Sequence, residues 1–312
     1  MDLLAIGADV GGSHITAQVY NLSDHTLLEG TRHRVEVDSK AQSDAILDKW
    51  AEAIRAAAGH LSIETTAGVG FAMPGPFDYP GGIAWFKGVE KYDHLYGINV
   101  REELRSRLGM PGNFRIRFLN DASSFAIGES FKGRSVRFSR FLAITLGTGF
   151  GSTFIRSHIP VAGEAGTPPD GFLYDIPFNG SNADNHFSTR WFLRQYQKRT
   201  GHEVAGVKQL AAQVHEDPVA EGLFSEFGRN LGGFLSPWLR GFEAEGLVIG
   251  GNIANAYPLF RESMSAQFSA NDIEVDVVIS ELQEDAAISG AALLCDDTIY
   301  AGLIVGQTEN TI

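Results

Sequence analysis

The sequence predicts an α/β fold made of two similar halves. Apolar strand-like segments alternate with amphipathic helical segments along the 312 residues, and this alternation is typical of α/β domains. A strand, a glycine-rich turn and a second strand occur in this order near residue 10 and again near residue 148. The repeat indicates an internal duplication, so we expect two lobes with a cleft between them.

Strands and helices of the first half follow from hydrophobic periodicity. Residues 42–58 are predicted to be helical because Ile46, Trp50 and Ile54 fall on one face of a helix. Pro74 and Pro76 enforce a loop after a short buried strand. The predicted strands are 3–8, 15–21, 31–37, 68–72 and 114–119, and the predicted helices are 42–58, 100–108 and 123–131.

The second half begins with a predicted strand that runs into the second glycine turn. Predicted strands and helices then alternate as they do in the first half. A loop-rich stretch, 160–185, separates this first hairpin from the helices that follow. Short apolar runs bounded by glycine are predicted to be buried strands. The predicted strands are 141–146, 153–155, 247–249 and 275–279, and the predicted helices are 189–198, 218–241 and 286–294.

Composition excludes several classes of protein. The net charge of −13 disfavours nucleic acid and anionic lipid as partners. No segment approaches the ~20 apolar residues of a membrane helix, and the first residues lack the basic region of a signal peptide. The single cysteine, Cys295, excludes an internal disulfide and a multi-cysteine zinc cluster, so a cytoplasmic location is expected.

The two glycine turns are candidate phosphate-binding loops. Both run into strands, whereas the dinucleotide-binding fingerprint opens a helix, and the chain has no Gly-Lys pair of the kind a P-loop requires. Glycine lets backbone N–H groups approach an anion closely. Ordinary hairpin turns are the alternative. The turn residues are Gly11, Gly12 and Ser13 in the first half and Gly147, Thr148 and Gly149 in the second.

Acidic and amide side chains stand at the ends of two predicted strands. Asp9 ends the first strand, where a carboxylate suits Mg²⁺ held through water, or else caps the turn amides. Asn120 and Asp121 follow the strand 114–119, and ligand sites gather at such strand ends. An aspartate there can take the proton of a hydroxyl that attacks a phosphate. The alternative is a helix N-cap, which both residue types favour.

Seven motifs in order resemble those of the ROK family (repressors, open reading frames and sugar kinases) over nearly the whole chain. This resemblance implies the actin-like, ribonuclease H-like ATPase fold. Residues 1–121 would form a smaller lobe, with 296–312 packing back on it, and 122–295 a larger lobe. The motifs lie at 9–13, 74–78, 119–129, 146–151, 163–166, 248–251 and 285–292.

The resemblance also implies a reaction, the transfer of a phosphoryl group from Mg-ATP to a hexose hydroxyl. Asp121 would be the general base, and Asp9 would hold Mg²⁺ through water. The glycine turns would bind the phosphates, and a homodimer is expected. Sugar contacts would come from Gly75, Asn120, Glu164, Thr167 and Asp184, and Gly250 and Gly251 would lie beside the adenosine.

The chain departs from the family's motifs in ways that bear on the substrate. Thr167 stands where the family has a histidine, and 178–188 has no cysteine, so no zinc site is expected. Asp184 aligns only loosely with the family's second sugar-binding glutamate. We expect an unmodified hexose, phosphorylated at its primary hydroxyl. A non-catalytic sugar-binding regulator or sensor is the alternative, although Asp9 comes too early for a preceding DNA-binding segment.

Overall fold

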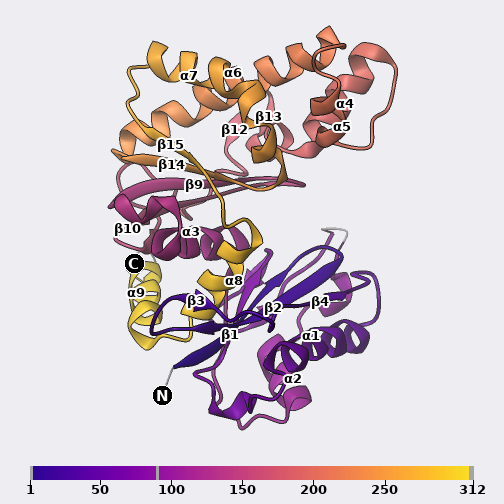
Figure 1. Cartoon of the computed structure of the whole chain (residues 1–312), viewed down its shortest axis with the longest axis vertical. Coiled ribbons are helices and arrows are strands. Elements are labelled where there is room, and N and C mark those ends of the chain that lie inside the picture. The colour runs from indigo at the N-terminus through magenta and orange to yellow at the C-terminus, as the bar shows by residue number, and fades with distance from the viewer. Residues whose placement is uncertain (1–2, 89–90, 309–312) are drawn as a thin grey trace. The chain divides into compact units, whose positions relative to one another are not determined.

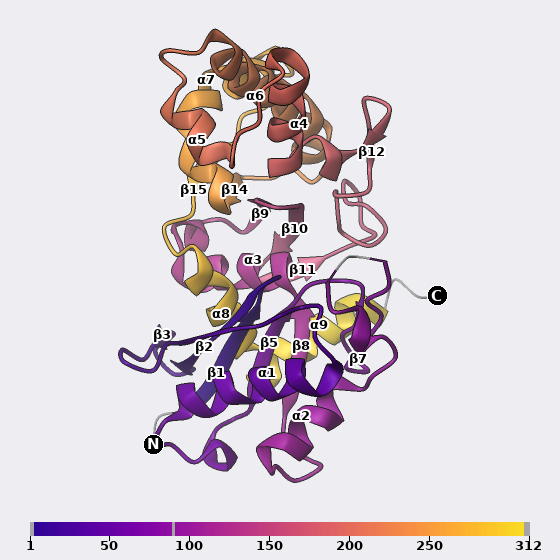
Figure 2. The same ribbon diagram turned by 90° about the vertical axis from the view of Figure 1, so that its right-hand side faces the viewer.

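The computed structural model describes residues 3–88 and 91–308 (Figures 1 and 2). The chain forms two compact units. The first contains the residues up to Gly133 together with Glu284–Val305, and the second contains Arg134–Gln283. Within the described residues, no helix combines the length and the apolar character that crossing a membrane requires.

The first unit is organised around a mixed sheet. Its strands are β1 (Leu4–Val10), β2 (His14–Asn21), β3 (Thr26–Leu27), β4 (His33–Glu36), β5 (Val69–Met73) and β8 (Ile116–Asn120). The order is β3-β2-β1-β5-β8, and β4 also pairs with β2. β1 and β2 form an antiparallel hairpin, whereas β1, β5 and β8 run parallel. The carboxyl ends of these three parallel strands therefore lie at one edge of the sheet.

Helices cover both faces of this sheet (Figure 1). Its helices are α1 (Ser43–Ala58), α2 (Val100–Leu108), α3 (Asp121–Lys132), α8 (Glu284–Leu293) and α9 (Asp297–Thr308). α1 and α2 share one hydrophobic core with β1, β2, β5 and β8, centred on the fully buried Trp50. α8 lies so close to the other face that a Cβ built on Gly7 would come within 2.0 Å of the Ile288 carbonyl oxygen. Glycine is required there because any side chain would collide with helix backbone.

α3 packs on α8 within the first unit. A Cβ built on Gly128 would lie 1.9 Å from the Ala286 carbonyl oxygen, and one on Gly290 would lie 1.8 Å from that of Ser124. The predicted lobes, 1–121 and 122–295, place both helices with the second half of the chain. This difference arises because the glycine contact draws the two helices together, and residues 309–312 of the predicted returning segment lie outside the described residues.

The second unit repeats the topology of the first. Its strands are β9 (Arg140–Leu146), β10 (Phe150–Arg156), β11 (Ile159–Val161), β14 (Gly246–Gly250) and β15 (Asp276–Ile279). They are ordered β11-β10-β9-β14-β15. β9 and β10 form an antiparallel hairpin, and β9, β14 and β15 run parallel, as β1, β5 and β8 do. The duplication expected from the two glycine turns is thus present in the fold.

The helices of the second unit bury an aromatic core against its sheet. They are α4 (Thr189–Thr200), α5 (Val207–Ala212), α6 (Pro218–Gly241) and α7 (Tyr257–Ala270). Phe187 lies at the centre of this core, with its ring centroid 5.1 Å from that of Phe234 and 6.0 Å from that of Phe227. Two short hairpins, β6 (Phe77–Asp78) with β7 (Ile83–Ala84) and β12 (Pro177–Phe178) with β13 (Ser181–Asn182), complete the strands.

Candidate functional site

The polar residues predicted at the strand ends of the first unit come from adjacent parallel strands. Asp9 pairs in register with Ala72, and Met73 pairs with Asn120. β5 ends at Met73, two residues before Gly75, which is exposed. The structure therefore places Asp9, Gly75 and Asn120 along one edge of the sheet, although the chain separates the first from the last by more than a hundred residues.

The first glycine turn joins β1 to β2. The Gly11 N–H donates to the His14 carbonyl oxygen at 2.9 Å and closes the hairpin. The Tyr92 hydroxyl donates to the Gly11 carbonyl oxygen at 2.6 Å and fixes the turn from outside. Within the described part of the chain, the N–H groups of Gly12 and Ser13 have no acceptor, and both residues are exposed. Adjacent free amides of this kind can bind an anion.

Asn120, not Asp121, is the N-cap of α3. The Asn120 Oδ1 atom accepts hydrogen bonds from the N–H groups of Ala122 at 3.0 Å and Ser123 at 3.2 Å. Its Nδ2 atom donates to the Tyr79 hydroxyl at 3.3 Å. α3 begins at Asp121, two residues before the predicted start. The capping alternative therefore applies to Asn120. The Asp121 carboxylate is exposed, and its Oδ1 atom accepts a hydrogen bond from the Ala122 N–H at 2.9 Å.

Negative charge accumulates at this edge of the first sheet. Burial and, to a smaller extent, the nearby Asp121 and Glu284 carboxylates raise the pKa of Asp9 to about 8, against a lowering effect of Arg32. Although the Asp121 side chain is exposed at the surface, desolvation by the surrounding protein raises its pKa, against the lowering effects of the Ala122 N–H and Lys91. Both shifts indicate that added positive charge here would favour the ionised carboxylates.

Glu284 is the acidic residue at this edge that our sequence interpretation missed. It accepts a hydrogen bond from the Thr16 hydroxyl at 2.8 Å and forms an ion pair with Arg32. Burial acts to raise the pKa of Glu284, but these two partners outweigh it and the pKa is lowered. The one signal in the sequence is that Glu284 directly precedes the family motif at 285–292.

The carboxylates at this edge suit magnesium, which prefers oxygen ligands and usually keeps several waters. Among the residues that the structure describes, no three His, Cys, Asp or Glu side chains are arranged to coordinate a metal directly. Asp9 thus offers a single carboxylate beside the turn, and its raised pKa indicates that a nearby cation would be stabilised. Binding of Mg²⁺ by Asp9 through water remains a prediction.

The second glycine turn joins β9 to β10. The Gly147 N–H donates to the Gly149 carbonyl oxygen at 3.0 Å, and Thr189 donates from its N–H and hydroxyl to the Gly147 carbonyl oxygen at 2.8 and 2.9 Å. In the described ranges, the N–H groups of Thr148 and Gly149 have no acceptor. Each unit therefore presents two neighbouring free amides at its own glycine turn.

Asp184 supports this second turn. Its Oδ1 atom accepts a hydrogen bond at 2.8 Å from the N–H of Phe150, the first residue of β10, and its Oδ2 atom pairs with Arg190. A Cβ built on Gly149 would lie 3.1 Å from Oδ1. The family resemblance predicts that Asp184 contacts the sugar. In the structure its carboxylate binds the Phe150 N–H and Arg190.

The segment around Glu164 and Thr167 forms a compact turn. The Glu164 N–H donates to the Thr167 hydroxyl oxygen at 2.9 Å, and the Thr167 N–H donates to the Glu164 carbonyl oxygen at 3.0 Å. The Glu164 carboxylate forms an ion pair with Arg156 at the end of β10. The Thr167 hydroxyl thus has a local structural function in addition to any contact with a ligand.

Gly250 and Gly251 lie next to the second glycine turn. Gly250 pairs in register with Thr145, near the end of β9. Gly251 has φ +83°, and a Cβ built on it would lie 2.4 Å from the Leu146 carbonyl oxygen. Glycine is needed at this position for both reasons, because the backbone conformation is left-handed and the backbone of β9 is in contact.

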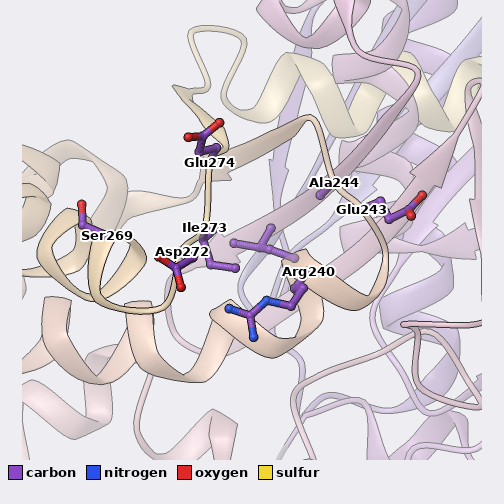
Figure 3. A pocket seen from close by; sticks show the side chains of 8 residues that line it. Arg240, Glu243, Ala244, Ser269, Asp272, Ile273 and Glu274 are labelled. Atoms are coloured by element: carbon purple, nitrogen blue, oxygen red, sulfur yellow. The ribbon is translucent and has the colours of Figure 1, made fainter.

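A hollow of about 560 Å³ in the second unit lies outside the predicted site (Figure 3). Its walls come from the end of α6 and from the connection between α7 and β15. Arg240 on one side and the carboxylates of Asp272 and Glu274 on the other give it mixed charge, and Arg240 bonds the Asn271 carbonyl oxygen. No residue predicted at the site lines it.

Comparison with known proteins finds one family and several sugar kinases similar to this chain. Residues 5–298 match the model of the ROK family. The chain is 25% identical to a glucokinase of Thermotoga maritima, over 95% of this chain and 98% of the relative. It is 24% identical to an N-acetyl-D-glucosamine kinase of Vibrio cholerae, over 92% and 98%.

Solved structures show the same fold. A ROK family glucokinase from Streptomyces griseus, crystallised with glucose and AMPPNP, superposes with a TM-score of 0.73 at 22% identity, covering 93% of this chain and 98% of that one. The ROK hexokinase from Thermus thermophilus gives a TM-score of 0.75 at 20% identity, covering 98% and 100%. The predicted actin-like α/β class is thereby confirmed. This chain belongs to the ROK family.

Proposed function

We propose that this protein is an ATP-dependent sugar kinase that phosphorylates a hexose hydroxyl. The observation that carries the proposal is the Asp121 carboxylate, which is exposed at the start of α3, the helix that Asn120 caps. The relatives named glucokinase and N-acetyl-D-glucosamine kinase support the reaction class. The S. griseus glucokinase that binds glucose and AMPPNP supports ATP as the phosphoryl donor.

Asp121 would act as the general base. The attacking sugar oxygen forms a bond to the γ-phosphorus, the bond from that phosphorus to the β–γ bridging oxygen breaks, and ADP leaves. The hydroxyl proton passes to the Asp121 carboxylate. A raised pKa of Asp121 makes the carboxylate a stronger base than an ordinary aspartate, and general-base catalysis of this kind contributes about 10²- to 10⁴-fold in rate.

The free amides of the two glycine turns would bind phosphate oxygens. Gly12 and Ser13 supply them in the first unit, and Thr148 and Gly149 in the second. Asp9 would hold Mg²⁺ through water, and the bound ion would supply positive charge for the β- and γ-phosphates. Gly250 and Gly251 would lie beside the adenosine.

We further propose that the acceptor is an unmodified hexose, phosphorylated at its primary hydroxyl. Asn120, Glu164 and Thr167 would contact its hydroxyl groups, with Gly75 allowing close approach of the loop after β5. Thr167 is shorter than the family's histidine and already donates within its own turn. The proposal of a homodimer rests on the family resemblance, and light scattering of the purified protein would test it.

A hexose panel tests the proposed function. Purified protein with Mg-ATP is incubated with glucose, mannose, fructose, N-acetylglucosamine and N-acetylmannosamine, and ADP release is followed. We expect sugar-dependent ADP release with the highest kcat/KM for an unmodified hexose. A preference for either acetylated sugar would contradict the acceptor class and leave the kinase reaction standing. Sugar binding without ADP release would instead support a non-catalytic regulator.

A further inference from the structure

Lys91 is a cation at the first glycine turn that the predicted site does not include. A Cβ built on Gly12 would lie 3.9 Å from Lys91 Cδ, so the lysine stem passes directly over this turn. The residue is half-buried. Within the described part of the chain, no carboxylate lies within 4.0 Å of its ammonium nitrogen. The Lys91 stem therefore lies at the turn, and its ammonium group has no ion-pair partner among the described residues.

Tyr92 fixes Lys91 in this place. Its side chain is fully buried, and its ring meets that of Trp50 edge-on with centroids 5.3 Å apart. Its hydroxyl donates to the Gly11 carbonyl oxygen at 2.6 Å, and its N–H donates to the Ser39 carbonyl oxygen at 2.8 Å. Because Tyr92 is anchored to the turn itself, its neighbour in the chain is positioned by the core and not by a surface loop.

Arg32, a second cation near this edge of the sheet, already has ion-pair partners. Arg32 forms ion pairs with both Glu284 and Asp285. Lys91 is close enough to Asp121 to lower the pKa of that carboxyl. The Asp121 and Glu284 carboxylates contribute negative charge here, which together with burial raises the pKa of Asp9. A triphosphate brought to this edge would be repelled unless positive charge met it.

We propose that Lys91 is a further catalytic residue, whose ammonium group contacts the γ-phosphoryl group of ATP at the first glycine turn and stabilises its oxygens during transfer. This inference rests on the proposed kinase function. Charge in phosphoryl transfer is spread over the three equatorial oxygens, and catalysis depends on cations that neutralise it. The Lys91 stem lies at the turn and its charge acts on the general base.

Substitution of Lys91→Met tests the proposal, because methionine keeps an unbranched stem and removes the charge. We expect kcat to fall by about 10²- to 10³-fold, as when one charge-stabilising donor is removed, while KM for the sugar stays within a few-fold. Affinity for AMPPNP should fall about 10-fold and affinity for ADP should not change, because only the former carries a γ-phosphate. Lys91→Arg should recover a large part of both losses.

Lys40→Met is the matched control. Lys40 is exposed, lies next to Ser39 in the loop that anchors Tyr92, and loses the same charge. Its kcat and nucleotide affinities should equal those of the unmodified protein. Equal loss of AMPPNP and ADP affinity in Lys91→Met, or kcat within threefold of normal, would overturn the proposal. An unmodified protein without kinase activity would refute the proposed function instead, and the AMPPNP and ADP affinities would still decide whether Lys91 contacts the γ-phosphate.

Tyr92→Phe provides a second variant if Lys91→Met proves unstable. It keeps the buried ring and removes only the hydroxyl that bonds Gly11. As a change in a positioning residue, it should weaken AMPPNP binding more than ADP binding, in the same direction as Lys91→Met but by less. If both nucleotides are affected equally, Tyr92 only stabilises the turn and the role of Lys91 is not supported.

Discussion

The Asn120 side-chain oxygen accepts a hydrogen bond from the Ser123 N–H at 3.2 Å, so the asparagine caps the helix that its neighbouring aspartate begins. Asp121 then lies in the first turn of α3, where a negative charge interacts favourably with the helix dipole. The two adjacent residues thus have separate functions. Asn120 fixes the helix, and Asp121 presents an exposed carboxylate whose charge acts on Asp9.

Asp121→Asn should abolish phosphorylation with little effect on folding. Asparagine keeps the size and an acceptor oxygen for the Ala122 N–H, but it cannot take the proton, so we expect kcat to fall by about 10²- to 10⁴-fold. Sugar affinity, measured by calorimetry, should stay within a few-fold. Asn120→Ala is the contrasting variant, and loss of the cap should cost about 1 kcal/mol of unfolding free energy. Near-normal turnover in Asp121→Asn would show that the base is wrongly assigned.

Asp184→Ala should weaken ATP binding more than sugar binding. Its Oδ1 atom holds the Phe150 N–H and its Oδ2 atom pairs with Arg190, so alanine leaves the second glycine turn without this support. We expect a several-fold rise in KM for ATP and little change in KM for the sugar. The reverse pattern would instead support the sugar contact that the alignment suggests. Asp175→Ala, an exposed position on the same loop, serves as the control.

Unfolding experiments across pH should detect the raised pKa of Asp9. The folded protein holds a proton on Asp9 up to pH about 8, whereas an unfolded aspartate loses it near its ordinary value of 3.8. The folded state therefore binds more protons between these limits, and this group lowers stability as pH rises through the window. Asp9→Asn should raise Tm at pH 8 more than at pH 5, in the absence of magnesium. An equal difference at both pH values would contradict the shift.

Gly251→Ala should destabilise the second unit. Alanine at φ +83° is strained, and its Cβ would meet the Leu146 carbonyl oxygen at 2.4 Å. Strain of this kind costs about 1–3 kcal/mol before the collision is counted, and thermal or urea unfolding measures it. Gly222→Ala in α6 is the control, since its Cβ would have open space. That change should stabilise the helix by about 0.5–1 kcal/mol. If Gly251→Ala left the free energy of unfolding unchanged, the turn would have adapted to the added Cβ.

The protein should fold and act without zinc. The loop that carries the zinc motif in the family here has apolar packing, with the Phe178 and Phe187 ring centroids 5.3 Å apart. Elemental analysis of purified protein should find zinc well below one equivalent, and a chelator with excess Mg²⁺ should leave activity and Tm unchanged. Phe187→Ala, at a fully buried position, should cost about 3–5 kcal/mol. Stoichiometric zinc would contradict this account of the loop.

Much of the fold could be predicted from local patterns. The predicted helix over 218–241 coincides with α6, and the predicted strand 141–146 lies within β9. α7 escaped prediction because its fourteen residues bury only three side chains, Phe260, Met264 and Phe268, and so show a weak apolar stripe. Strands of two residues, such as β6 and β12, are too short to show any periodicity.

By itself the sequence determined the α/β class, the two glycine turns, and the placement of Asp9 and Asp121 at strand ends, because each depends on residues that are close together in the chain. Only the tertiary structure decided two hydrogen bonds at this edge of the sheet. Thr16 bonds Glu284, 268 positions away in the chain, and Tyr92 bonds the first glycine turn. The physical reason is packing. Glycines such as Gly7 and Gly128 let α8 approach β1 and α3 closely, and that approach sets which distant charges meet.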